Sequence, residues 1–199
     1  MNYLAHLLLA GEDPEEKLGA LMGDFTRGRL ENLARHYPPG IMQGIATHRR
    51  IDHFTDRHHR VMPSKARFSK PRRRYAGIIV DVLYDHFLSH HWDHFSLIDR
   101  RAFISDVYDL LERNHHRLPE RLQRASTLMI TQDWLGSYHH IDQIGEVYDR
   151  MSRRLRRPNT LRGSLEEVRE NYPDLERDFA DFFPALVDHT QSVAVTSVP

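Results

Sequence analysis

Residues 77–92 read Gly-Ile-Ile-Val-Asp-Val-Leu-Tyr-Asp-His-Phe-Leu-Ser-His-His-Trp. Its apolar residues fall on nearly every face of a helix, which predicts a central, buried helix. Asp81 and Asp85 nevertheless lie inside it, one turn apart, and His86 follows directly. An isolated carboxylate is costly to bury unless it is neutralised, paired with a cation or bound to a metal. The conflict between apolar pattern and buried charge indicates a functional site.

The rest of the chain predicts further helices and no β-strand of useful length. The sequence Asp13-Pro14-Glu15-Glu16 is typical of a helix start, and this helix is expected to end near Met22. Ser164-Leu165-Glu166-Glu167 predicts a capping box at a later helix. Apolar residues recur with helical spacing between these signals. We therefore expect an all-α, single-domain helical bundle of about seven to nine helices over residues 1–192, followed by a flexible tail at 193–199.

The composition of the 199 residues excludes several classes of protein. No Cys is present, so disulfides and thiolate metal sites are excluded, which fits a reducing compartment. No apolar run approaches the roughly 20 residues of a membrane span. A soluble, cytoplasmic protein is therefore expected. The 15 His are unusual, because His is the common neutral metal ligand and proton carrier near pH 7.

Charge is distributed unevenly along the chain, although 28 basic and 28 acidic residues give a formal net charge of zero. Arg57 to Arg74 contains eight Lys or Arg and no carboxylate, and Arg150 to Arg162 contains six Arg and no acid. Residues 164–189 reverse the sign, with eight Asp or Glu against two Arg. Each basic run is either solvated surface or a site for phosphate or an acidic partner.

Ionisable residues in apolar or helix-face settings suggest a metal site. His48, Asp52 and Asp56 are spaced four residues apart, so they form one stripe along a helix. The candidate metal ligands are His6, Asp24, His48, Asp52, Asp81 and Asp85. Imidazole and carboxylate without thiolate suit Mn²⁺, Mg²⁺, Fe²⁺ or Zn²⁺. Two helices that each offer ligands one turn apart can face each other around one or two such ions.

Each candidate also has an interpretation without a metal. His6 fits a hydrogen-bonded core histidine, and Asp24 fits a turn residue after a glycine. Asp52 and Asp56 could pair with Arg49, Arg50 or Arg60 on the surface. Asp81 and Asp85 could be neutralised by the nearby run Arg72–Arg74. The whole set is harder to explain in this way than any single member, which favours the metal site.

A divalent ion at such a site would activate water for hydrolysis, while a carboxylate or His handles the proton. The residues expected to act in catalysis are Asp85, His86 and Asp56. Guanidinium groups match phosphate oxygens bidentately, and the arginines that flank the candidate ligands are Arg27, Arg49, Arg50, Arg72, Arg73 and Arg74. Cleavage of a phosphate ester is therefore favoured over peptide or sugar chemistry.

Four motifs resemble a known family over nearly the whole chain. They are Met1-Asn2-Tyr3-Leu4-Ala5-His6-Leu7, Gly23-Asp24-Phe25-x-Arg27-Gly28, Gly44-x3-His48-Arg49-Arg50-Ile51-Asp52-x2-Thr55-Asp56 and Asp81-x3-Asp85-His86-Phe87-Leu88-x2-His91-Trp92. In this order they resemble the acyl carrier protein phosphodiesterase, or hydrolyase, family. The resemblance implies hydrolytic removal of 4′-phosphopantetheine from holo-acyl carrier protein, a divalent cation that is preferentially Mn²⁺, and an all-α fold akin to HD-domain phosphohydrolases.

The resemblance also implies the partner. Acyl carrier proteins are small and acidic, so the Arg57–Arg74 run, together with Arg150–Arg162, is expected to steer and dock holo-acyl carrier protein beside the metal. Neither a nucleic acid nor a membrane is expected as a partner, and the oligomeric state is left open. Two alternatives stand: an HD-like nucleotide phosphohydrolase, and a non-catalytic helical module that binds an acidic carrier.

Overall fold

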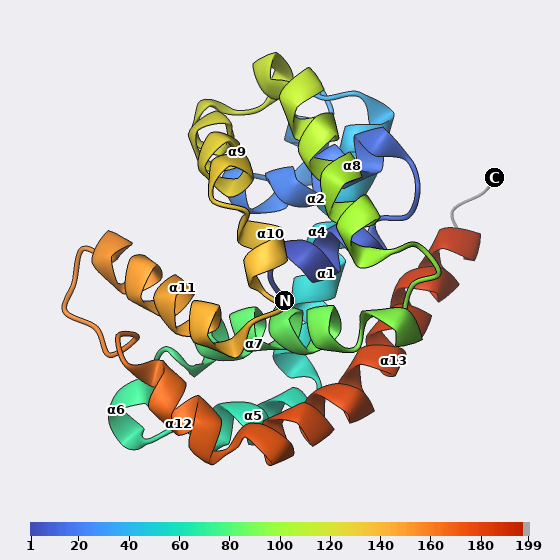
Figure 1. Ribbon diagram of the computed structural model, residues 1–199. Coiled ribbons are helices and arrows are strands. Elements are labelled where there is room, and N and C mark those ends of the chain that lie inside the picture. The colour runs from blue at the N-terminus through green and yellow to red at the C-terminus, as the bar shows by residue number, and fades with distance from the viewer. Residues whose placement is uncertain (197–199) are drawn as a thin grey trace. The chain divides into compact units, whose positions relative to one another are not determined.

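The computed structural model describes residues 1–196, which contain helices and no β-strand (Figure 1). The α-helices are α1 Tyr3–Leu9, α2 Pro14–Met22, α3 Leu30–Leu33, α4 Pro39–Arg57, α5 Val61–Ala66, α6 Lys70–Arg73, α7 Ala76–His90, α8 Arg100–Arg113, α9 Glu120–Thr131, α10 Trp134–Ser137, α11 Ile141–Arg154, α12 Ser164–Glu170 and α13 Tyr172–Thr196. Single 3₁₀ turns lie at η1 Gly23–Phe25, η2 Trp92–His94 and η3 His115–Arg117. The all-α prediction is confirmed. Helices of four to seven residues, too short to show a periodic pattern, raise the number above the expected seven to nine. None of the helices described is both long and apolar enough to cross a membrane.

The helix boundaries show which local signals decide the structure. The carboxylate of Asp13 accepts a hydrogen bond of 2.8 Å from the Glu15 N–H, and α2 ends at Met22 as predicted. The capping box predicted at Ser164 is wrong. The residue that caps α12 is Gly163, with a φ of 73°, and the Ser164 hydroxyl donates backwards to the Leu161 carbonyl at 2.7 Å. Gly163 adopts the left-handed backbone conformation that glycine allows, so the helix begins after this residue without a cap from the Ser164 side chain.

The chain divides into two compact units. Unit 1 comprises Met1–Asn2, His53–His90 and Ser137–Pro199, and unit 2 comprises Tyr3–Asp52 and His91–Gly136. The division falls inside α4, between Asp52 and His53. A single domain over residues 1–192 stays a prediction. Of the predicted tail, residues 193–196 continue the backbone of α13, and 197–199 lie outside the described residues.

The predicted central helix is α7, and it forms the core of unit 1. Its side chains Tyr84 and Phe87 are fully buried, and α5, α11 and α13 pack against it. The Tyr84 and Phe179 rings lie 5.3 Å apart between centroids, and Phe87 and Phe179 lie 5.7 Å apart. Aromatic pairs at these distances add to the stabilisation from burial. The sequence pattern over residues 77–92 therefore predicted the burial of α7 correctly.

In unit 2, α2 and α4 touch through their backbones at Gly19 and Gly44. A Cβ added at Gly44 would lie 2.1 Å from the Glu16 carbonyl oxygen and 2.7 Å from the Ala20 nitrogen. A Cβ at Gly19 would lie 2.1 Å from the carbonyl oxygen of Ile41. The clashing atoms belong to the backbone, so a side chain here would push the two helices apart. This close contact sets the position of Ala20 relative to α4.

We predict that Gly44→Ala destabilises the protein by about 1–3 kcal/mol, the usual cost of overpacking. The matched control is Gly77→Ala in α7, where the added Cβ would lie 4.0 Å from the nearest atom, Cε of Lys65. Because Ala is favoured over Gly in a helix, this control is expected to gain roughly 0.5–1 kcal/mol. Chemical denaturation measures both free energies of unfolding. Equal values for the two variants would contradict the close packing of α2 and α4.

Candidate metal centre

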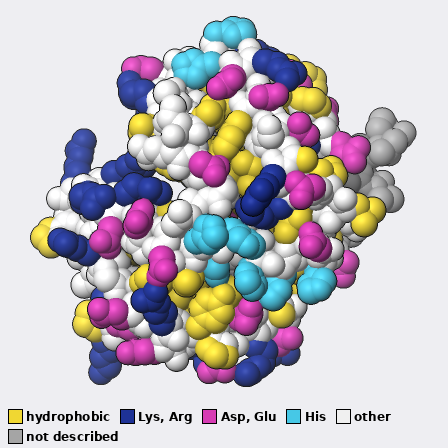
Figure 2. Space-filling model, in the orientation of Figure 1, with side chains coloured by type: hydrophobic (Ala, Val, Ile, Leu, Met, Phe, Trp, Pro, Cys, Tyr) yellow, Lys and Arg dark blue, Asp and Glu magenta, His cyan; other side chains and the backbone are white. Residues whose placement is uncertain are grey.

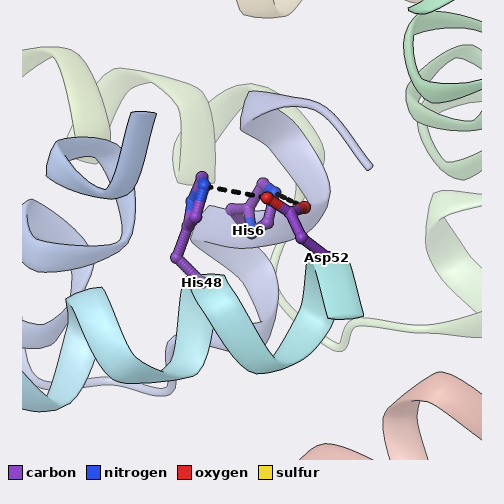
Figure 3. A group of neighbouring side chains, drawn as sticks. All are labelled: His6, His48 and Asp52. Atoms are coloured by element: carbon purple, nitrogen blue, oxygen red, sulfur yellow. Dashed lines mark ion pairs between the residues drawn. The ribbon is translucent and has the colours of Figure 1, made fainter. Parts of the chain in front are cut away.

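Unit 2 brings His6, His48 and Asp52 together, and we call these three residues the His-Asp cluster (Figure 3). One possible ligand atom of each lies within 4.8 Å of the others. His6 comes from α1, while His48 and Asp52 lie one turn apart on α4. Asp52 Oδ1 is 3.2 Å from His6 Nε2, and Asp52 Oδ2 is 3.2 Å from His48 Nε2. The spacing of His48 and Asp52 was visible in the sequence.

The two imidazole rings are buried and stacked. Their centroids are 3.8 Å apart and their planes differ by 17°. The Nδ1–H of His48 donates to the Ala20 carbonyl at 2.7 Å, which turns Nε2 towards Asp52. A Cβ at Gly23 would lie 2.2 Å from Cγ of His48, so glycine leaves the space that this ring fills. In the sequence Gly23 predicted only a turn, because packing against a distant ring leaves no local signal.

Asp24 lies in η1 beside the His-Asp cluster. Its Oδ1 is 3.4 Å from His48 Nε2, and its side chain is 52% exposed. His48 Nε2 therefore faces two carboxylates, those of Asp24 and Asp52. A lone pair on this nitrogen would be repelled by both, so a cation or a proton is required between them.

The pKa shifts follow from these contacts. Burial, helped by the charge on His48, lowers the pKa of His6 to about 4, although the hydrogen bond to Asp52 opposes the shift. Burial also acts to lower the pKa of His48, but hydrogen bonds to Asp24 and Asp52 outweigh it and raise this pKa to about 9. The two histidines hold the pKa of Asp52 well below its ordinary value, against the effect of burial. The contacts thus favour a single positive charge, carried by the His48 ring.

The donor set of the His-Asp cluster fits a divalent ion. Ligand atoms at about 2.0–2.2 Å from one ion lie roughly 3 Å from each other, close to the 3.2 Å separations found here. A ligating His usually donates its second N–H to a carbonyl, as His48 does to Ala20. Nδ1 of His6 is buried and has no hydrogen-bond partner among the described residues. Asp52 is 43% exposed, so one side of the cluster is open to solvent.

The arginines predicted near the ligands differ in their contacts. Arg49 donates to the carbonyls of Gly28, at 2.8 Å, and of Thr26, at 3.4 Å, and so holds the loop that follows Asp24. Arg27 is exposed on the same loop. Arg50 donates to Thr47 Oγ1 at 2.8 Å. Arg49 is therefore already occupied in positioning the loop.

The carboxylates of α7 have their contacts in unit 1. The Asp85 side chain is fully buried and accepts a hydrogen bond of 3.2 Å from the Asn2 backbone N–H. Asp81 Oδ1 lies 2.9 Å from the N-terminal ammonium of Met1. The conflict seen in the sequence is thus met at least in part by donors 80 and 83 positions away in the chain. A metal-ligand role for Asp81 and Asp85 stays a prediction.

The other predicted site residues of unit 1 are placed as follows. Asp56 is exposed and pairs with Lys65 at 2.8 Å. Arg72 pairs with Glu167 at 2.6 Å, Arg73 donates to the Ala66 carbonyl at 3.4 Å, and Arg74 is exposed. Their predicted roles also stay predictions.

Both ring nitrogens of His86 are hydrogen-bonded within unit 1. Nδ1–H donates to the Tyr138 carbonyl at 2.8 Å, and Nε2 accepts from the Tyr172 hydroxyl at 2.8 Å. Burial lowers the pKa of His86 to about 4, although the bond to Tyr138 opposes the shift. A neutral ring therefore joins α7 to α13 and to the segment around Tyr138. Sequence reasoning missed both tyrosines, because neither lies near His86 in the chain.

Comparison with known proteins places the chain in a sequence family. The model of a family described as "Acyl carrier protein phosphodiesterase" matches residues 1–186. A protein of that name from Photorhabdus laumondii is 35% identical over 193 residues, which cover 96% of each chain. The protein of the same name from Serratia proteamaculans is 35% identical, and the match covers 96% of this chain and 98% of that protein. The one from Salmonella agona is 36% identical, and the match covers 94% of this chain and 96% of that protein. No solved structure matches the chain, so the likeness to HD-domain enzymes stays a prediction.

We predict that His86→Gln weakens the loss of stability in acid. The folded-state pKa of about 4 lies below the ordinary value of 6.5, so the unfolded chain takes up the proton first as the pH falls. As the pH falls from about 6.5 to 4, His86 should therefore lower the free energy of unfolding progressively. The total loss is on the order of 3 kcal/mol, because each pKa unit corresponds to about 1.36 kcal/mol.

Urea denaturation at several pH values in this window measures the effect. His86→Gln should be less stable than the wild type at pH 7, where hydrogen bonds are lost, and its stability should fall less on acidification. The control, His36→Gln, changes an exposed histidine and should keep the wild-type slope. Parallel curves for the wild type and His86→Gln would contradict a buried, neutral His86.

Proposed function

Because the chain belongs to the acyl carrier protein phosphodiesterase family, we propose that it hydrolyses the phosphodiester joining 4′-phosphopantetheine to the serine of holo-acyl carrier protein. A water oxygen bonds to phosphorus, the bond from phosphorus to the serine oxygen breaks, and the serine oxygen takes a proton. The products are the apo-carrier and 4′-phosphopantetheine. The observation that carries the proposal is the His-Asp cluster, in a chain that matches the family over residues 1–186. We place this activity in the cytoplasm.

The proposal assigns a divalent cation, preferentially Mn²⁺, to His6, His48 and Asp52, with Asp24 beside them. Mg²⁺, Fe²⁺ and Zn²⁺ accept the same nitrogen and oxygen donors. When bound, the ion supplies Lewis acidity to phosphate oxygens and to water. The protein orients its own ligands: Ala20 fixes the His48 ring, and Asp52 accepts from both imidazoles in the described arrangement.

The remaining predicted roles belong to the same proposal. Arg27 and Arg50 are proposed to bind phosphate oxygens, and Arg49 both to position the loop and to bind phosphate. Arg73 and Arg74 belong to the surface that receives the carrier, and Arg72 supports that surface through its pair with Glu167. Asp56, Asp85 and His86 are the proposed proton-transfer groups. Of these, His86 would have to exchange a partner, because both of its nitrogens are hydrogen-bonded.

We predict that His48→Gln and Asp52→Asn lower turnover of holo-carrier by about 100-fold or more, since each removes a donor that holds the cation. Mass spectrometry of the carrier in Mn²⁺ buffer measures the loss of phosphopantetheine. His36→Gln, an exposed histidine of the same unit, is the control and should retain full activity.

Three outcomes of this assay would contradict the proposal. Full activity of the wild type in excess chelator would exclude the divalent cation. Turnover of nucleotides without turnover of the carrier would favour the HD-like nucleotide phosphohydrolase. Tight carrier binding with neither turnover nor bound metal would favour the non-catalytic binding module.

Asp81→Asn and Asp85→Asn test the predicted ligand role of the α7 carboxylates. Asparagine keeps an oxygen that can accept from the donors found at these positions, so the helical fold should survive. If Asp81 and Asp85 hold the cation, each variant should lose tightly bound Mn²⁺ and turnover. Circular dichroism checks the fold and metal analysis checks the bound ion. Variants that keep stoichiometric Mn²⁺ and full turnover would contradict this role.

A further inference from the structure

The two acid-free basic runs of the sequence meet in unit 1. Arg72 Nε donates to the Thr160 carbonyl at 3.2 Å, and Arg72 Nη2 donates to the Arg162 carbonyl at 3.3 Å. In return, Thr160 Oγ1 donates to the Pro71 carbonyl at 2.9 Å. These bonds span about 90 positions of sequence and fasten α6 to the loop between α11 and α12. The two runs therefore form one surface.

Arg72 is a structural part of this junction. Its guanidinium pairs with Glu167 at 2.6 Å, and its side chain is only 20% exposed. Glu167 also accepts from the N–H and the hydroxyl of Ser69, at 2.8 and 2.7 Å. Against the effect of burial, these bonds hold the pKa of Glu167 below its ordinary value. Removing Arg72 would leave Glu167 without its cation, so Arg72 is unsuited to contact a partner.

Several earlier cations of the Arg57–Arg74 run are neutralised within unit 1. Arg67 lies 3.1 Å from Asp178 and 3.2 Å from Asp174, both on α13. Arg60 lies 3.4 Å from Asp181 on the same helix. The acid-rich segment 164–189 thus pairs with part of the basic run. This portion of the run has less charge to offer a partner than the sequence suggests.

A basic surface remains around the junction of α6 with the loop after α11. We call it the composite basic surface, and it consists of Lys70, Arg73, Arg74, Arg153, Arg154, Arg156, Arg157 and Arg162, all exposed. Figure 2 shows Lys and Arg side chains gathered over α11 and the loop that follows it in Figure 1. Arg162 lies 3.9 Å from Asp149 but is 83% exposed, and such surface pairs are weak. The positive charge of this surface therefore remains accessible.

We propose that the composite basic surface binds the acidic face of the carrier protein, and that the neutralised portion from Arg60 to Arg67 does not. This inference rests on the proposed function, which supplies the acidic partner. A compact acidic protein fits better than a nucleic acid, because the chain has no net charge and unit 1 also carries the acid-rich segment 164–189. A long polyanion would meet repulsion there, whereas a small acidic face need cover only the composite basic surface.

Charge reversal on this surface tests the inference. The first variant is Arg156→Glu/Arg157→Glu, on the loop, and the second is Arg73→Glu/Arg74→Glu, beside α6. The matched control is Arg35→Glu/Arg121→Glu, which makes the same change of net charge at two exposed arginines of unit 2. Calorimetry measures the Kd for holo-acyl carrier protein at low and at high salt. Turnover of a small phosphodiester, bis(p-nitrophenyl) phosphate, with Mn²⁺ reports on the metal centre alone.

Both surface variants should raise the Kd at low salt by about tenfold or more and lose most of its salt dependence, because steering and contact charges are removed. The control should keep the wild-type Kd, and both the control and the loop variant Arg156→Glu/Arg157→Glu should cleave the small diester at the wild-type rate. An unchanged Kd in both surface variants, or an equal rise in the control, would overturn the inference. Tighter binding of a DNA duplex than of the carrier would also overturn it. Carrier binding that depends on this surface, without release of phosphopantetheine, would support the docking surface and contradict the proposed function.

Discussion

Asp52 holds the candidate metal centre together, because it is the only carboxylate within 3.2 Å of both stacked imidazoles among the described residues. Two buried rings 3.8 Å apart cannot both carry a positive charge at low cost, and the opposite pKa shifts of His6 and His48 express this constraint. A divalent cation would satisfy the same carboxylate and both nitrogens at once. The chemistry proposed for the protein therefore depends on one residue of α4.

The backbone of unit 2 positions the side chains of the His-Asp cluster. Gly19 and Gly44 let α2 and α4 touch, and this contact places the Ala20 carbonyl where the His48 ring can donate to it. Gly23 leaves the space beside that ring and begins the turn that carries Asp24. Gly23 and Gly44, which belong to the sequence motifs, thus act through close packing, and Gly23 also acts through the turn that it begins. Arg49 completes the arrangement by holding the following loop from α4.

The sequence predicted those features that depend on local pattern. The all-α fold, the bounds of α2, the burial of α7 and the position of His48 and Asp52 on one face of a helix all follow from periodicity, capping residues or a four-residue spacing. Contacts between distant segments left no such signal. Asp85 meets the Asn2 backbone, His86 meets Tyr172, and Arg67 meets an acidic helix. The sequence therefore showed correctly where basic and acidic residues cluster, but only the structure shows which of these residues pair with each other.

The position of the bound cation is the most direct test of the candidate metal centre. Crystals grown with Mn²⁺ and measured at the manganese absorption edge would locate the ion by anomalous scattering. A cation held by the His-Asp cluster gives a peak in direct contact with the imidazoles of His6 and His48 and with the carboxylate of Asp52. Electron density for His48 hydrogen-bonded to both carboxylates, with no anomalous peak at the His-Asp cluster, would contradict the metal centre.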